Sequence, residues 1–267
     1  MRTCPAFAFA LAACATAPPM PSFLRVSTTW TIDSLALGET RRICVYTPPG
    51  YAEDATARFP VLYMPDGGID EDFVHVAEVV HFGIAWGLLR PVLVVGIENT
   101  ERRRDLTGPT EIASDLEIAP RVGGSATFRA FLRDELIPTI EARYRTDGER
   151  AIVGESLAGL FVVETFLLAP DLFTTCIAIS PSLWWNDHGA VREAERCLRA
   201  GPDRRGTLYL TNADEDDIAP FVAELATIVA RAAPAVALIH EPMPTQFHDT
   251  VFRAAAPKAL RTVFAPR

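Results

Sequence analysis

Residues 150–168 place a serine in a setting that suits nucleophilic chemistry. Their sequence, RAIVGESLAGLFVVETFLL, runs from a short β-branched stretch through GESLAG into a long apolar stretch. A strand that turns sharply into a helix is the context of the G-x-S-x-G elbow, which holds its serine above the sheet edge at a helix N-terminus that favours an oxyanion. Gly154 and Ala158 are small enough for strand and helix to approach closely, although alanine here replaces the motif's last glycine. We therefore predict that Ser156 is a nucleophile, with an ordinary Gly-Ser turn as the alternative.

The base that would activate this serine is expected after the last strand, because triads on such a sheet run in the order serine, acid, histidine. His75 and His81 precede the serine. His188 comes too early, and His240 lies within the last predicted strand, where sheet packing would fix its ring. His248 lies in the following loop, just before the closing helix. Its position selects it as the base, with a helix-capping role as the alternative.

The acid is expected after the seventh strand, which ends at Thr211. One carboxylate there would hold the histidine tautomer and stabilise the imidazolium, whereas another would cap the next helix. Sequence position does not decide between the four candidates, which are Asp214, Glu215, Asp216 and Asp217.

Two backbone amides are expected to bind the oxyanion. One is the amide of Leu157, directly after the nucleophile. The other is expected from Gly67 or Gly68 in the loop after the third strand, because glycines allow the backbone to turn its N–H groups into the site. A common turn is the alternative for these glycines.

These residues require a sheet that brings several strand ends together, and the chain alternates strands and helices accordingly. Continuous apolar strands imply a mostly parallel sheet covered on both faces. Eight strands with the serine after the fifth predict the α/β-hydrolase fold. The expected strands cover 26–35, 41–48, 60–64, 92–97, 151–153, 175–180, 207–211 and 235–240. The expected helices cover 71–89, 127–144, 160–168, 190–200, 218–232 and 250–264, and residues 98–124 are predicted to form an arginine-rich functional loop.

Composition limits the classes of partner. The 267 residues are 49% hydrophobic and 22% charged, which is typical of a globular chain with a sizeable core. A net charge of −9 without a basic run argues against nucleic acid. No stretch of about 18 consecutive apolar residues predicts a transmembrane helix. The five cysteines show no metal-ligand spacing, Cys44 and Cys176 are predicted to be buried thiols, and neither a metal nor an organic cofactor is implied.

The first residues have the composition of a secretory leader. One arginine precedes an apolar stretch over residues 6–13, and small residues and prolines follow. Residues 11–14, LAAC, resemble a bacterial lipobox, which predicts lipidation of Cys14 and an exported protein, periplasmic or lipid-anchored. A chance LAAC or a misassigned start codon is the alternative, and the protein would then be cytoplasmic. Residues 1–22 are therefore separated from a single predicted domain, 23–267.

Five stretches together resemble one esterase family of the α/β-hydrolases. They are VLYMPDGG, VVGIENTERRRDLT, IVGESLAGLF, ISPSLWWN and FHDTVFRAA, and the resemblance covers about residues 26–265. The family includes enterochelin and related siderophore esterases, feruloyl esterases, S-formylglutathione hydrolases and mycolyltransferases. The chain is most similar to its siderophore-esterase-like branch.

The resemblance implies roles for particular residues. Ser156 would be the nucleophile, His248 the base, and the amides of Gly68 and Leu157 the oxyanion hole. In the siderophore-esterase branch the acid follows a G-x-x-E pattern, and Ala213 at the glycine position makes Asp216 the acid, although some relatives work with serine and histidine alone. The resemblance further implies a site-mouth role for Arg104 and an acyl- or aryl-pocket role for Trp184 and Trp185, with plain core aromatics as the alternative.

The predicted function is therefore hydrolysis of a small-molecule carboxylic ester through an acyl-enzyme. The resemblance implies siderophore or aryl esters. Acyl transfer of the mycolyltransferase type, or an exported binding protein without turnover, are the alternatives. The sequence predicts no oligomeric state.

Overall fold

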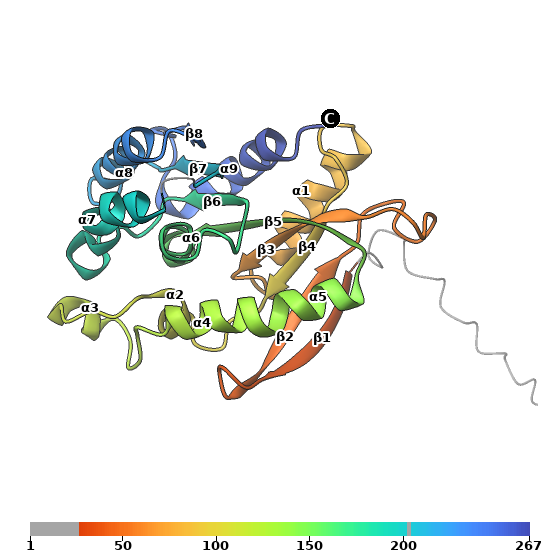
Figure 1. Ribbon diagram of the computed structural model, residues 1–267, viewed down its shortest axis with the longest axis horizontal. Coiled ribbons are helices and arrows are strands. Elements are labelled where there is room, and N and C mark those ends of the chain that lie inside the picture. Colours follow the sequence, from red (N-terminus) through yellow and green to blue (C-terminus); the bar gives the residue numbers. More distant parts are fainter. Residues whose placement is uncertain (1–26, 202–203) are drawn as a thin grey trace, which may run out of the picture.

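The computed structural model describes residues 27–201 and 204–267, and their eight strands form one sheet (Figure 1). The strand order is β1-β2-β4-β3-β5-β6-β7-β8. β2 pairs antiparallel with β1 and β4, and all other neighbours pair parallel. This is the mostly parallel eight-stranded sheet that the sequence predicts. The bounds are β1 (Ser27–Ser34), β2 (Glu39–Tyr46), β3 (Phe59–Pro65), β4 (Leu93–Ile97), β5 (Thr146–Glu155), β6 (Thr175–Ile179), β7 (Gly206–Thr211) and β8 (Val236–His240).

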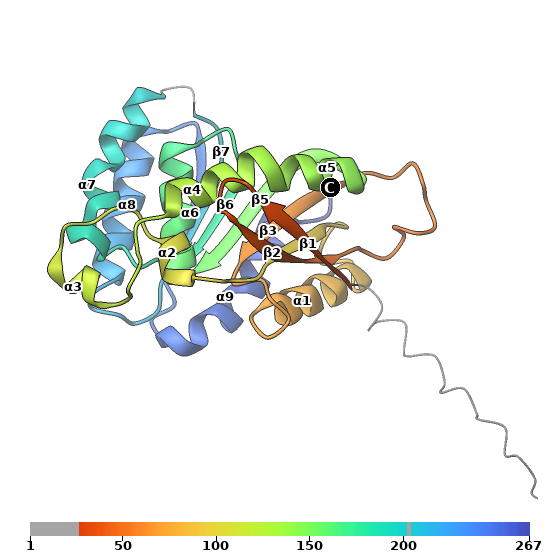
Figure 2. The same ribbon diagram turned by 90° about the horizontal axis from the view of Figure 1, so that it is seen from below.

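Helices cover both faces of the sheet (Figure 2). α1 and α9 pack on one face, where Phe73 and Phe252 join a buried apolar cluster with β3 and β4. α4 to α8 pack on the other face, around a larger cluster that includes Phe128, Phe161 and Leu225. The bounds are α1 (Phe73–Ala85), α2 (Arg102–Leu106), α3 (Ala113–Glu117), α4 (Ser125–Phe131), the π-helical turn η2 (Leu132–Leu136), α5 (Ile137–Arg143), α6 (Leu157–Leu168), α7 (Trp185–Ala200), α8 (Ala219–Ala232) and α9 (His248–Val263).

Several elements differ in detail from the predicted ones. The helix predicted over 127–144 is a succession of α4, η2 and α5 with a continuous helical backbone, and its Pro138 follows directly after the π-helical turn η2. The predicted loop 98–124 contains the short helices α2 and α3. α7 begins at Trp185, ahead of the predicted 190, but residues 186–188 have left-handed backbone angles, so regular helix starts only after them.

The carboxyl ends of the central strands lie side by side at one edge of the sheet. Glu155 at the end of β5 is opposite Ile179 of β6, and Ile179 is opposite Thr211 of β7. Loops that leave such neighbouring ends converge, which is where open parallel sheets bind ligands. The turn after β5, the loops after β6 and β7, and the start of α9 therefore form one site.

The predicted leader 1–22 and Cys14 lie outside the described residues. None of the helices in 27–201 and 204–267 combines the length and apolar character needed to cross a membrane. Cys44 and Cys176 are buried free thiols, as predicted, and so is Cys197.

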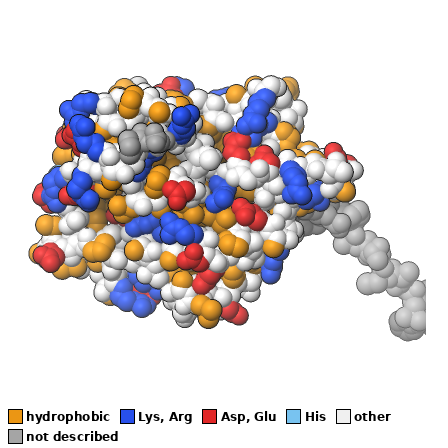
Figure 3. Space-filling model, in the orientation of Figure 1, with side chains coloured by type: hydrophobic (Ala, Val, Ile, Leu, Met, Phe, Trp, Pro, Cys, Tyr) orange, Lys and Arg blue, Asp and Glu red, His pale blue; other side chains and the backbone are white. Residues whose placement is uncertain are grey.

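Charged side chains of both signs are intermingled on the face shown in Figure 3. Several arginines of the described chain pair with acids, for example Arg102 with Asp66 and Arg129 with Glu164. The described residues of this face therefore offer no broad patch of one sign.

Candidate active site

Ser156 occupies the sharp turn between β5 and α6 in a strained backbone conformation. Its φ of 59° lies in the left-handed region, which costs a non-glycine residue about 1–3 kcal/mol. Two hydrogen bonds fix the turn, because the Ser156 amide donates to the Ile179 carbonyl at 3.0 Å and the Ser182 amide donates to the Ser156 carbonyl at 3.0 Å. A Cβ on Gly154 would lie 2.6 Å from the backbone of Ala158. The elbow therefore requires a glycine at 154, as the predicted close approach of strand and helix demands.

Ser156 and His248 meet at the carboxyl edge of the sheet. The Ser156 Oγ lies 3.1 Å from His248 Nε2, and the other ring nitrogen, Nδ1, is hydrogen-bonded to Glu215 Oε1. The His248 side chain is 46% exposed and that of Glu215 only 10%, so the imidazole is open to a substrate while its acid is covered. A carboxylate only accepts, so it keeps the proton on Nδ1 and leaves Nε2 free to take the serine proton.

The acid position predicted from the family pattern, Asp216, is wrong, because Glu215 contacts the histidine. The Glu215 carboxylate is turned inward by two donors, Ser180 Oγ at 2.7 Å and the Ala213 amide at 3.2 Å. Asp214, Asp216 and Asp217 are exposed, and none of them is hydrogen-bonded to His248. The acid is thus one of the four candidates that position alone leaves open, and the G-x-x-E register is one residue too long for this turn.

None of these carboxylates caps the next helix. The N-cap of α8 is Ile218, which makes no side-chain capping hydrogen bond. The turn is instead closed by the backbone, since the Ala219 amide donates to the Glu215 carbonyl at 2.9 Å. The helix-capping role predicted for one of these carboxylates is therefore absent, and the exposed aspartates are solvated.

The predicted oxyanion amides differ in availability. No described residue accepts a hydrogen bond from the Leu157 amide, which leaves it open to a ligand. The Gly67 amide donates to the Ile97 carbonyl at 3.0 Å, and a Cβ on Gly67 would lie 2.3 Å from Gly96, so this glycine serves packing against β4. The Gly68 amide donates to Glu71 Oε2 at 2.7 Å. In this structure, therefore, both glycine amides are engaged within their own loop and sheet edge.

An ion pair that the sequence reasoning did not single out ties that loop to the nucleophile. Asp66 has a left-handed φ of 56° and binds Arg102 through both carboxylate oxygens, at 2.7 and 2.8 Å. Arg102 also donates to the Glu155 carbonyl at 3.5 Å, and Asn99 bridges Asp66 and Glu71 at 2.6 and 2.7 Å. Arg102 lies in the stretch ENTERRRDLT, which is part of the family resemblance, but the resemblance implies a role for Arg104 in that stretch.

Glu155, next to the nucleophile, is an unusual carboxyl group. Burial raises its pKa to about 7, the charges of Asp72 and Asp66 add to the rise, and His248 and Arg102 oppose it. Despite these neighbouring carboxylates, no group of side chains in 27–201 and 204–267 is arranged to hold a metal ion.

This pKa predicts how the stability depends on pH. The folded protein holds the Glu155 proton more tightly than the unfolded chain, whose ordinary value is 4.5, so the stabilisation is complete at lower pH and is lost as pH rises toward about 7. We expect the thermal midpoint of Glu155→Gln to fall less than that of the wild type between about pH 4.5 and pH 7. Glu224→Gln, which changes an exposed acid on α8, is the control. An identical fall in the wild type and in Glu155→Gln would contradict the assignment.

A model of the family described as "Putative esterase" matches residues 34–241. The chain belongs to this esterase family. Ferri-bacillibactin esterase BesA of Bacillus subtilis is 36% identical over 156 residues, which cover 52% of each chain. Siderophore triacetylfusarinine C esterase of Aspergillus fumigatus is 29% identical over 170 residues, 59% of this chain and 56% of that protein. The chain thus spans about half the length of these curated relatives.

Solved structures of esterases share the fold. An IroE-like serine hydrolase from Shewanella oneidensis superposes with a TM-score of 0.79 at 25% identity, over 89% of this chain and 80% of the other. The siderophore hydrolase EstA of Aspergillus nidulans gives a TM-score of 0.81 at 21% identity, over 94% and 98%. The predicted α/β-hydrolase fold and the predicted family are confirmed.

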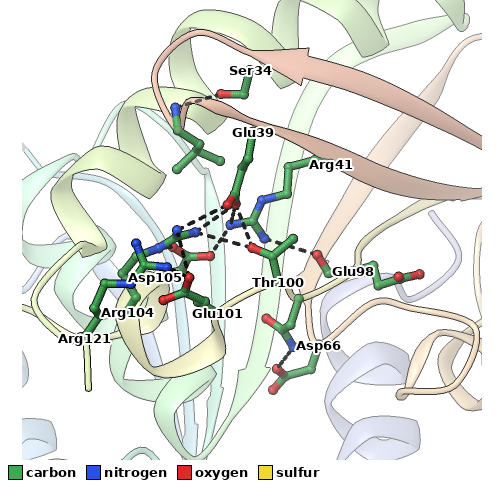
Figure 4. A network of polar contacts seen from close by, with 12 residues as sticks. Ser34, Glu39, Arg41, Asp66, Glu98, Thr100, Glu101, Arg104, Asp105 and Arg121 are labelled. Carbon is green, nitrogen blue, oxygen red and sulfur yellow. Dashed lines mark hydrogen bonds and ion pairs between the residues drawn. The ribbon is translucent and has the colours of Figure 1, made fainter. Parts of the chain in front are cut away.

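Arg104, for which the resemblance implies a role at the mouth of the site, is held by several acids. Its guanidinium donates to Glu39 at 2.8 and 3.2 Å and to Asp105 at 2.6 Å, within a network that includes the fully buried Arg41 paired with Asp105 (Figure 4). Although burial opposes it, hydrogen bonds from Arg104 and Thr100 and the charge of Arg41 lower the pKa of Glu39 to about 2. Arg104 therefore joins β2 to α2 and makes no hydrogen bond to Ser156, His248 or Glu215, and its predicted contact with substrate stays a prediction.

The two tryptophans divide between core and loop. Trp185 is 2% exposed, lies in the larger apolar cluster and donates from Nε1 to the Gly108 carbonyl at 2.9 Å. The alternative of a core aromatic therefore describes Trp185, and its predicted role in a substrate pocket is corrected. Trp184 is half-buried, with its ring centre 6.0 Å from that of Trp185. Its contact with substrate stays a prediction.

Proposed function

We propose that this esterase-family chain is a serine hydrolase that cleaves carboxylic esters through an acyl-enzyme. The observation that carries the proposal is the continuous path of hydrogen bonds from Ser156 through His248 to Glu215. Three segments far apart in the sequence supply it, at adjoining strand ends, with the nucleophile on a strained elbow. Such an arrangement of nucleophile, base and orienting acid is the signature of acyl transfer to serine.

In the proposed acylation, Ser156 Oγ forms a bond to the ester carbonyl carbon while its proton passes to His248 Nε2. Glu215 holds the Nδ1 proton and stabilises the imidazolium, without itself taking a proton. The Leu157 amide donates to the oxyanion. Collapse breaks the bond to the leaving alcohol, which takes the proton from Nε2. Water then repeats the sequence on the acyl-enzyme, giving the acid product and free serine.

For the substrate we propose a siderophore ester. The support is sequence similarity to relatives whose names specify ferri-bacillibactin and triacetylfusarinine C. The test is a hydrolysis screen with catecholate and hydroxamate siderophore esters, feruloyl esters and simple acyl esters of increasing length, with Ser156→Ala as the blank. Preference for a siderophore ester over the simple esters supports the proposal. Preference for another class contradicts the substrate, and a transfer product formed when an alcohol acceptor is added would reveal acyl transfer.

We also propose export with lipidation at Cys14, on the support of the leader composition and the LAAC stretch. The expected result is a mature protein that begins at Cys14 and partitions with membranes, while Cys14→Ser is released or remains unprocessed. Intact-mass measurement on protein from a bacterial host with lipoprotein processing checks this. A mass that begins at Met1 contradicts it.

A further inference from the structure

The loop between β6 and α7 carries two buried serine hydroxyls that the mechanism above does not use. Ser180 is fully buried and Ser182 is 2% exposed. Each lies against one end of the catalytic path: Ser180 Oγ is 2.7 Å from Glu215 Oε2, and Ser182 Oγ is 3.3 Å from Ser156 Oγ. One short loop, Ser180-Pro181-Ser182, therefore touches both the acid and the nucleophile.

The direction of the Ser180 hydrogen bond follows from its neighbours. The Ala213 amide donates to Ser180 Oγ at 2.9 Å, so the hydroxyl proton is directed to the Glu215 carboxylate, which only accepts. The backbone of Ser180 is held at a left-handed φ of 37° while its amide donates to the Thr211 carbonyl at 2.8 Å. A hydroxyl fixed in this way determines where Glu215 Oε2 lies, and so directs Oε1 at the histidine.

The direction of the Ser182 hydrogen bond follows from the proton count at the nucleophile. Because Glu215 holds the proton on His248 Nδ1, the Ser156 hydroxyl donates to Nε2. Its single proton is then used, so Ser182 Oγ donates to Ser156 Oγ. The Ser182 amide also donates to the Ser156 carbonyl, which holds the two residues together.

We propose that Ser180 is a positioning residue for the triad acid and that Ser182 is a catalytic donor to the nucleophile, an inference that rests on the proposed function. As the Ser156 proton moves to Nε2, negative charge grows on Oγ, and the hydrogen bond from Ser182 becomes charge-assisted and stronger. Ser180 acts through the acid. It holds one oxygen of the Glu215 carboxylate while His248 binds the other, so the carboxylate needs no reorganisation when the imidazolium forms.

Ser180→Gly tests the first role without the risk of backbone strain, because glycine adopts a φ of 37° readily. We expect kcat for p-nitrophenyl butyrate to fall about 10- to 100-fold with little change in KM. We also expect the downfield proton resonance of His248 Nδ1–H to be lost. Ser125→Ala is the matched control, since Ser125 is equally buried and its Oγ donates to Glu164 at 2.7 Å, outside the triad. If Ser180→Gly does not fold, Ser180→Cys replaces it, with a smaller loss expected. A folded Ser180 variant with wild-type kcat and resonance overturns the assignment.

Ser182→Ala and Ser182→Cys test the second role, because cysteine nearly keeps the volume and is only a weak donor. We expect both to react about tenfold more slowly with a fluorophosphonate probe, at unchanged thermal midpoint for the cysteine variant. Wild-type labelling rates in both variants overturn the role of Ser182 alone. If the wild-type protein itself is not labelled, or Ser156→Ala is labelled equally, the proposed function fails instead.

Discussion

Ser156→Ala and His248→Ala are each expected to lower kcat by about 10⁵-fold or more while the protein stays folded. Ser156 Oγ is the atom that bonds to substrate in the proposed mechanism, and His248 Nε2, 3.1 Å away, is its proton acceptor. Neither change removes much packing, since His248 is half exposed and alanine suits the Ser156 backbone no worse than serine. Because the two residues act as one unit, the double variant should be little slower than either single variant. Steady-state kinetics with thermal midpoints measures both effects.

His81→Ala provides the control for this pair. His81 is a half-buried histidine on α1 whose Nδ1 lies 3.2 Å from Tyr46 Oη, outside the proposed site. Its replacement should leave kcat unchanged. Turnover retained by Ser156→Ala or by His248→Ala would remove that residue from the mechanism, and turnover lost by His81→Ala as well would indicate a general loss of folding.

The features predicted well are those encoded by neighbouring residues. The apolar strands β3, β4 and β6 are buried throughout, and each is a continuous hydrophobic run in the sequence. The elbow follows from the local spacing of Gly154, Ser156 and Ala158. His248 follows from chain order once the strands are counted, because parallel strands bring their carboxyl ends to one edge.

The features that the sequence did not reveal are mostly contacts between residues far apart in the chain. The four acids after β7 are consecutive in the sequence, and the position of the Glu215 carboxylate depends on Ser180, 35 residues earlier. Arg104 is held by Glu39, 65 residues away, a pairing that no local pattern reveals. The Gly68 amide is different, since Glu71 lies only three residues on. Whether the Gly68 amide is free depends on where the Glu71 side chain lies, and the residue pattern Asp66-Gly67-Gly68 does not specify that.

The second large effect is expected in the turn of four acids after β7, residues 214–217, where only Glu215 contacts His248. Glu215→Gln is expected to lower kcat by about 10²- to 10⁴-fold, because the amide cannot stabilise imidazolium and can present an N–H to Nδ1, which selects the wrong tautomer. Asp216→Asn is the matched control: it neutralises the next residue, which is exposed, and should leave kcat and the thermal midpoint nearly unchanged.

The comparison of these two variants distinguishes three arrangements of the site. Loss of turnover in Glu215→Gln alone agrees with the hydrogen bond between Glu215 Oε1 and His248 Nδ1. Loss in Asp216→Asn alone would mean that Asp216 is the acid during catalysis, as the G-x-x-E pattern predicts. Full activity in both would mean that serine and histidine suffice. Because Gln keeps the length of Glu, and Ser180 and the Ala213 amide can still hydrogen-bond to its carbonyl oxygen, a loss in Glu215→Gln reports the missing charge and the tautomer, with little contribution from packing.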